Sequence, residues 1–147
     1  MGTVIFSELV TELQTDPLTL GYASLLAAGN DAAVYALLND KSGPGSGSID
    51  REFVNAGTLQ SNVVATEYLA LTAAQRELWL SLMVASQGNV EVINNEVRNQ
   101  IIEVWGPATT TRTNMSALQT RTGSRAEVLW GDGAVVSYSE IARARGG

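Results

Sequence analysis

The stretch LTAAQRELWLSLMVASQG, Leu71 to Gly88, decides the predicted fold. Thr72 stands three residues before Gln75, which is the spacing of a capping box at the start of a helix. Gly88 suits the left-handed turn that follows many helices. Apolar side chains recur at helical spacing between these ends, at Leu78, Trp79, Leu82, Met83 and Ala85. We therefore predict a central helix with an unusually broad apolar surface.

Two helices and a loop are predicted before this stretch. Apolar periodicity predicts a first helix over residues 4–13, and the sequence TDP at 15–17 ends it because the residue before a proline avoids the α region. A second helix follows the capping residue Asn30 and covers residues 31–39. The sequence DKSGPGSGS at 40–48 is rich in Gly and Ser and predicts an exposed connecting loop.

Two further helices are predicted after the central one. In residues 89–106 the apolar positions recur every three or four residues, at Val90, Ile93, Val97, Ile101 and Val104. Their β-branched side chains also suit a strand, but the helical period and the polar opposite face favour a helix. The Thr-rich segment 108–122 predicts one short helix around Met115 and Leu118.

The C-terminal stretch SRAEVLWGDGAVVSYSE, residues 124–140, combines serines and glutamates in a way that suits either catalysis or capping. The pairs at capping-box spacing are Ser124 with Glu127 and Ser137 with Glu140. A catalytic serine needs a base, but the chain has no His and its only lysine, Lys41, lies in the predicted loop. We therefore predict two helix starts, separated by a glycine turn at 131–133 and a short extended segment near 134–137.

The predicted fold class is all-α. We expect residues 1–147 to form a single small domain of five to seven short helices, with the Gly/Ser loop at 40–48 exposed and a mildly basic C-terminal segment over 106–147. The helices are expected to enclose one core, formed by Leu9, Leu13, Leu37, Leu78, Leu82, Ile93, Val97, Ile101 and Leu129.

The residue inventory excludes many activities. The chain contains no Cys and no His, so thiolate nucleophiles, imidazole bases and zinc sites built on these residues are ruled out. We therefore expect no enzymatic activity, no cofactor, no metal and no small-molecule substrate. No apolar run approaches the roughly 18 residues of a membrane span, so no membrane partner is expected either.

The net charge of −6 is unevenly distributed along the chain. Residues 1–105 carry four basic and twelve acidic side chains, while residues 106–147 carry five arginines and three acids. The acidic part repels phosphates, so no nucleic-acid partner is expected. We predict a mildly basic partner surface at Arg125, Trp130, Arg143 and Arg145, and the alternative interpretation is that these arginines lie on solvated helix faces.

Five segments together resemble a known group of proteins. They are TDPLTLGYA at 15–23, LLND at 37–40, EYLALTAAQRELW at 67–79, VWGPATTTRTNMSALQ at 104–119 and SRAEVLWGDGAVVSYSEIARAR at 124–145. In this order they resemble a family of small tailed-bacteriophage proteins encoded among the virion structural genes. The resemblance covers nearly the whole chain, but the loop at 40–48 is longer here and the segment 130–139 is also longer than in many relatives.

The resemblance implies a role in a phage particle. On this basis we expect a non-enzymatic structural component of a tailed-bacteriophage virion, at the neck or tail near the head–tail interface, made in the host cytoplasm. Its partners would be other virion proteins, bound in multiple copies in a symmetric assembly. The alternatives are a capsid decoration protein and an intracellular phage protein that binds and inhibits a host protein.

Overall fold

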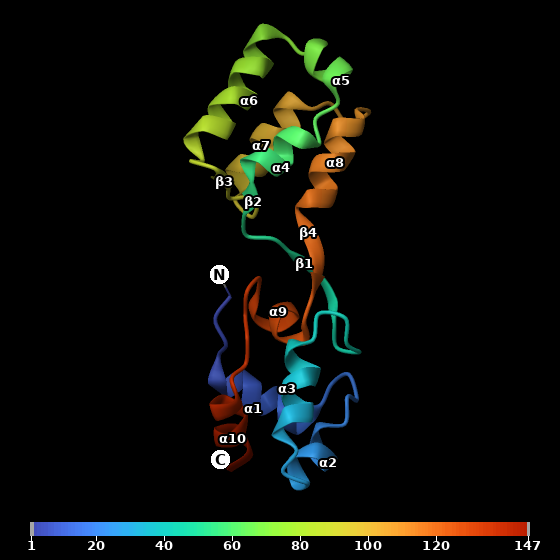
Figure 1. Ribbon diagram of the computed structural model, residues 1–147, viewed down its shortest axis with the longest axis vertical. Helices are drawn as coiled ribbons and strands as arrows, with labels where there is room; N and C mark the ends of the chain where they lie inside the picture. The colour runs from blue at the N-terminus through green and yellow to red at the C-terminus, as the bar shows by residue number, and fades with distance from the viewer. Residues whose placement is uncertain (1, 147) are drawn as a thin grey trace. The chain divides into compact units, whose positions relative to one another are not determined.

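The computed structural model describes residues 2–146, which are mostly helical. These residues contain ten α-helices and four short strands, and the chain divides into two compact units. Unit 1 consists of the residues up to Ile49 and from Thr122 on, and unit 2 of Asp50–Arg121. The chain passes from unit 1 to unit 2 through β1 (Gly47–Asp50) and returns through β4 (Thr120–Gly123), and these two strands pair with each other (Figure 1).

Unit 1 is built from helices at both ends of the sequence. Its elements are α1 (Phe6–Thr15), α2 (Tyr22–Ala27), α3 (Asp31–Asn39), α9 (Arg125–Trp130) and α10 (Tyr138–Gly146). Its core consists of Leu9, Leu13, Tyr22, Val34, Leu38, Ala126, Ala134, Val136 and Ile141. The TDP sequence ends α1 as expected, since Asp16 takes the left-handed conformation with φ 42° directly after the helix. N- and C-terminal segments thus share one core.

Unit 2 contains the central helix and the elements that pack on it. They are β2 (Val54–Asn55), α4 (Ala56–Ser61), α5 (Ala65–Leu69), α6 (Ala73–Ala85), β3 (Asn89–Val90), α7 (Asn95–Val104) and α8 (Thr110–Leu118). Strands β2 and β3 are antiparallel, with Val54 opposite Val90. The core includes Leu59, Trp79, Leu82, Met83, Ile101, Val104, Trp105 and Met115. No helix within residues 2–146 is long and apolar enough to cross a membrane.

The predicted capping boxes are confirmed. Thr72 and Gln75 bond reciprocally at the start of α6, and Ser124 and Glu127 do so at the start of α9. At the start of α10, the Ser137 hydroxyl accepts the N–H of Glu140, whose carboxylate accepts the N–H of Ser137. These features depend on residues three apart, so local sequence is sufficient to specify them.

Several features differ from the sequence-based expectation. The fold is not purely all-α, because two small sheets are present, and residues 2–146 contain ten helices rather than five to seven. The helix predicted over 89–106 begins only at Asn95, because Asn94 caps it and Val90 pairs with Val54 in the sheet of β2 and β3. The segment predicted as extended, residues 134–137, lies outside any helix, and both backbone groups of its Val136 bond to the side chain of Asn39.

The prediction of one core is also wrong. Of the expected core residues, Leu9 and Leu13 belong to the cluster of unit 1, whereas Leu82 and Ile101 belong to that of unit 2. Ile93 is 43% exposed. Periodicity shows that a helix has an apolar face, but it does not show which other helix covers that face.

The Gly/Ser loop is less exposed than predicted. Gly45 is buried, and a Cβ atom at this position would lie 2.9 Å from the Cβ of Arg125. Lys41 also lies near Glu127, with 3.9 Å between Nζ and Oε1. The absence of side chains at the glycines therefore lets the loop pack closely on α9.

We expect Ser124→Ala to lower the free energy of unfolding of unit 1 by about 1 kcal/mol, the usual loss for an N-cap serine. Its hydroxyl accepts the N–H of Glu127 at 3.2 Å, and the residue is only 2% exposed. Urea unfolding followed by circular dichroism would measure the loss. Ser7→Ala, at an exposed position of α1, serves as the control, and equal stabilities of the two variants would contradict the capping role.

Candidate interaction surface

Arg125 does not contribute to a partner surface. It is only 8% exposed and forms a bidentate ion pair with Glu12, with Nη2 to Oε1 at 2.7 Å and Nε to Oε2 at 2.9 Å. The hydroxyl of Tyr22 donates to the same carboxylate at 2.9 Å. The prediction of Arg125 as an exposed contact is thus corrected, because Glu12, 113 residues away in sequence, draws it into the interior of unit 1.

This buried group is structural in character. The hydrogen bond to Glu12 raises the pKa of Arg125, so the guanidinium stays charged at every relevant pH. Burial, together with Glu12, raises the pKa of the Tyr22 hydroxyl well above its ordinary value and keeps it neutral. All three side chains satisfy one another, so the group offers no unpaired base or nucleophile to a substrate.

The other three predicted contacts lie in unit 1 as well. Arg143 is exposed and stacks over the ring of Phe6, with 3.8 Å from its Cζ to the ring centroid. Arg145 is exposed and forms an ion pair with Asp31. Trp130 is half-buried against the core of unit 1, and its Nε1 has no hydrogen-bond partner among the described residues.

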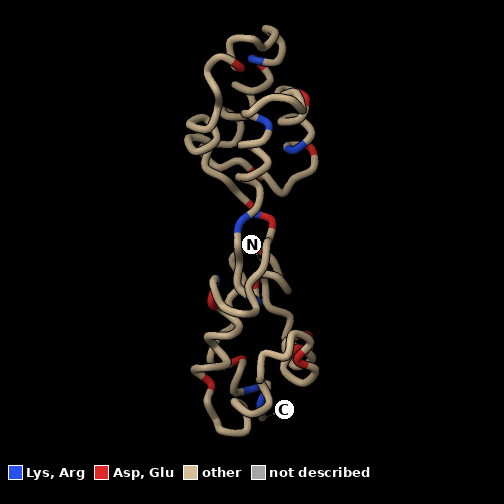
Figure 2. Tube along the Cα trace, turned by 90° about the vertical axis from the view of Figure 1, so that its right-hand side faces the viewer, with Lys and Arg blue, Asp and Glu red and all other residues tan. Residues whose placement is uncertain are grey.

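A basic surface is therefore not formed by the C-terminal segment as a whole. Its arginines are divided, since Arg112 and Arg121 belong to unit 2 and the others to unit 1. Unit 1 carries four basic and eight acidic side chains, a net charge of −4. In Figure 2 blue and red positions are accordingly interspersed along the tube rather than gathered at the C-terminal end.

A different surface stands out on unit 2, along the outer side of α6. Leu80 is 48% exposed and Val84, one turn later, is 78% exposed, while Leu69 at the end of α5 is 70% exposed. We call this the α6 surface; it consists of Leu69, Glu77, Leu80, Ser81, Val84 and Ala85. Neighbouring exposed apolar side chains of this size are a feature of protein interaction sites.

Shallow hollows adjoin the α6 surface. One of about 360 Å³ lies between α4, α5 and α6 and is lined by Gln60, Val63, Ala65, Tyr68, Leu69 and Leu80. A second, of about 410 Å³, extends along α6 from Glu77 to Ala85 and shares Leu80 with the first. The lining is mainly apolar, so the surface suits burial of apolar side chains rather than binding of a charged molecule.

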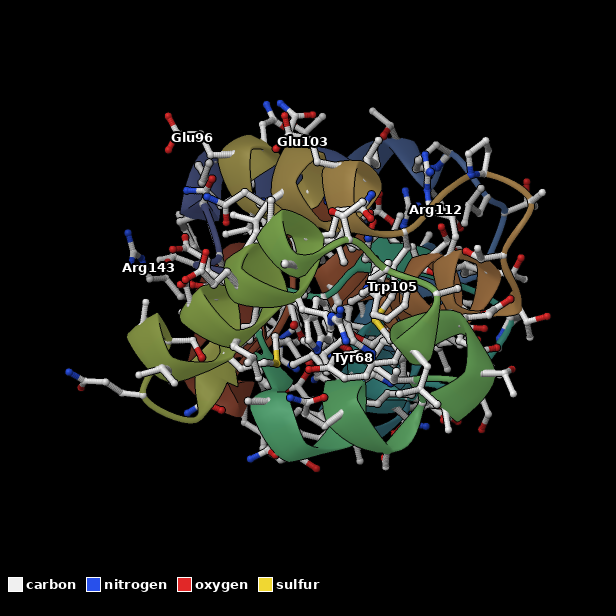
Figure 3. All side chains as sticks on the ribbon, turned by 90° about the horizontal axis from the view of Figure 1, so that it is seen from above. Tyr68, Glu96, Glu103, Trp105, Arg112 and Arg143 are labelled. Atoms are coloured by element: carbon white, nitrogen blue, oxygen red, sulfur yellow. The ribbon has the colours of Figure 1, made fainter. Side chains whose placement is uncertain are left out.

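The interior of unit 2 holds this surface in place. Trp79, on the inner side of α6, meets Trp105 edge to face with ring centroids 5.4 Å apart, and its Nε1 donates to the Gln60 side chain at 3.1 Å. Trp105 is fully buried and Tyr68 is half-buried beside it in the view of Figure 3, while Glu96 and Glu103 lie on the outside of α7. Two large buried indoles fix the rotation of α6, so Leu80 and Val84 must face outward.

Glu67 positions the α5 side of the surface. Its carboxylate accepts the backbone N–H groups of Thr110 and Thr111 and the hydroxyl of Thr111, at 2.6 to 2.7 Å. The hydroxyl of Thr111, with help from the backbone groups, lowers the pKa of Glu67. This carboxylate thereby caps α8 from α5, the helix that ends at Leu69.

No matching family model, curated protein or solved structure is found for this chain. The site must be interpreted from its own geometry. Within residues 2–146, no three acidic side chains converge in a way that could hold a metal ion. Among the described residues, the α6 surface is a place where large apolar side chains of neighbouring elements are exposed together.

The sequence contained a signal for the α6 surface. Apolar residues occupy seven of the eight positions from Leu78 to Ala85, far more than one buried stripe requires. Such a helix is either buried on all sides or presents a second apolar face to a partner. Only the structure shows that Trp79, Leu82 and Met83 are buried and that Leu80 and Val84 are exposed.

Proposed function

We propose that this chain is a non-enzymatic structural component of a tailed-bacteriophage virion, at the neck or tail, which binds virion proteins in multiple copies through the α6 surface. The observation that carries the binding role is the exposure of Leu69, Leu80 and Val84 on one side of unit 2. The phage context rests on the sequence resemblance in the five segments from residue 15 to residue 145.

Charge and burial support a binding role over catalysis. The most deeply buried ionised pair, Glu12 with Arg125, is closed to solvent and fully paired. The hollows beside α6 are lined mainly by apolar side chains, and the Gln60 side chain there already accepts the indole N–H of Trp79. An active site needs a nucleophile or base within reach of a polarised substrate. An apolar helix face of this kind suits lasting contact with a neighbouring protein in an assembly.

Purified particles of the phage that encodes the chain provide the test. Mass spectrometry is expected to find the chain in the particles, and Val84→Asp is expected to lower its incorporation by about tenfold or more, because a carboxylate at a buried contact costs on the order of 1.4 kcal/mol or more. Ile102→Asp is the matched control, since Ile102 is 49% exposed on α7 outside the α6 surface.

Two results would contradict the proposal. A chain that is abundant in infected cells but missing from the particles would exclude a structural role in the virion. Equal incorporation of the Val84→Asp and Ile102→Asp variants would exclude the α6 surface as the contact.

A further inference from the structure

We infer that the α6 surface pairs with the α6 surface of a second copy of this chain, the two α6 helices lying antiparallel with Leu80 of each opposite Val84 of the other. This inference rests on the proposed function in one respect. A particle that holds many copies of the chain gives them the high local concentration that a weak dimer needs. The structural basis of the pairing is independent and lies in the spacing, shape and charge of α6.

The spacing of the exposed positions suits helix pairing. Ala73, Glu77, Leu80 and Val84 are exposed and follow one another at intervals of four, three and four residues. This is the narrow seam along which two helices pack side by side, with Leu and Val as the inserting side chains. The outer side of this 13-residue helix thus has the spacing of a seam, with Leu80 and Val84 as its two large apolar positions.

The shape of the surface is suited to a copy of itself. A two-fold interface requires the same patch to supply both the protruding side chain and the hollow that receives it. Val84 is the most exposed large apolar side chain among the described residues, at 78%, and the hollow of about 360 Å³ lies beside Leu80. Antiparallel pairing brings Val84 of each copy toward Leu80 and the adjacent hollow of the other.

The position of Glu77 selects the antiparallel direction. It is the only charged residue of the α6 surface, and parallel pairing would place two Glu77 carboxylates side by side. Antiparallel pairing around Leu82 separates them by about 15 Å along the axis at 1.5 Å per residue, beyond the Debye length of about 8 Å. It also opposes the two helix dipoles.

The small extent of the α6 surface limits the affinity of the pairing. The α6 surface comprises one side of a single 13-residue helix with Leu69 beside it, whereas a standard stable complex involves about 20–30 residues and roughly 800 Å² on each partner. We therefore expect a reversible dimer that forms as the concentration rises.

Sedimentation of the purified full-length chain from about 10 μM to about 1 mM, the range of weak affinities, is expected to show reversible dimerisation. Leu80→Lys and Val84→Glu are each expected to remain monomeric, while an equimolar mixture of the two is expected to dimerise, since antiparallel pairing sets the introduced charges opposite each other. Ile102→Glu is expected to dimerise like the unaltered chain. An unaltered chain that stays monomeric, or a mixture that does not associate, would overturn the inference.

A cross-linking experiment provides a second test if either charged variant fails to fold. The chain contains no cysteine, so Ser81→Cys introduces a single thiol close to the expected two-fold axis, and oxidation is expected to link two copies. Ser7→Cys, at an exposed position of α1, should not form this link, and equal cross-linking of both variants would contradict the pairing. A monomeric chain that is still found in particles would refute the pairing alone, whereas a dimer absent from particles would refute the proposed function alone.

Discussion

Replacing Arg125 with alanine is expected to destabilise unit 1 by about 3–5 kcal/mol, because Glu12 would be left buried without its counter-charge. The carboxylate would keep only the hydroxyl of Tyr22 as a partner in this group. A loss of this size is a large fraction of the stability of a typical domain. Urea unfolding followed by circular dichroism would measure it, and hydrogen exchange would show that the effect lies in unit 1.

Arg145→Ala is the matched control for this prediction. It removes an ion pair with Asp31 at the surface, where such pairs contribute about 0–1 kcal/mol. The combined variant Glu12→Leu, Tyr22→Phe and Arg125→Met should recover most of the loss, since it removes all the polar partners together. If Arg125→Ala were no more destabilising than Arg145→Ala, the buried pair would not be holding α1 to α9.

Trp79→Ala is expected to destabilise unit 2 by about 3–5 kcal/mol, because it removes a fully buried indole and leaves a cavity beside Trp105. The side chain of Gln60 would also lose the hydrogen bond that it accepts from Nε1 of Trp79. Thermal and urea unfolding would report this loss. Since Trp79 fixes the rotation of α6, hydrogen exchange in α6 should also increase.

Val84→Ala on the same helix provides the comparison. Its side chain is largely exposed, so at low protein concentration the change is expected to stay within about 0.5 kcal/mol. A similar loss of unfolding free energy in Trp79→Ala and Val84→Ala would mean that α6 is rotated so that the α6 surface is buried. That result would remove the basis of the proposed contact.

The predictions from sequence were correct where residues close together in the chain determine the structure, and wrong where distant residues determine it. The short Thr-rich helix around Met115 and the caps at Thr72, Ser124 and Ser137 were predicted correctly, since neighbouring residues determine them. Val90 was assigned to a helix, but pairing with the distant Val54 placed it in a strand. Tertiary contacts override local preference in such short segments.

The sequence by itself determined the helical character of the chain, the capped starts of α3, α6, α9 and α10, and the absence of imidazole and thiol side chains. These follow from residue types and from spacings of three and four positions. Only the tertiary structure decided that two cores form, that Arg125 pairs with Glu12 inside unit 1, and that Leu80 and Val84 face outward. The physical reason is that burial depends on which distant segments pack together, and a helix with apolar residues on all sides does not specify which of its faces will be covered.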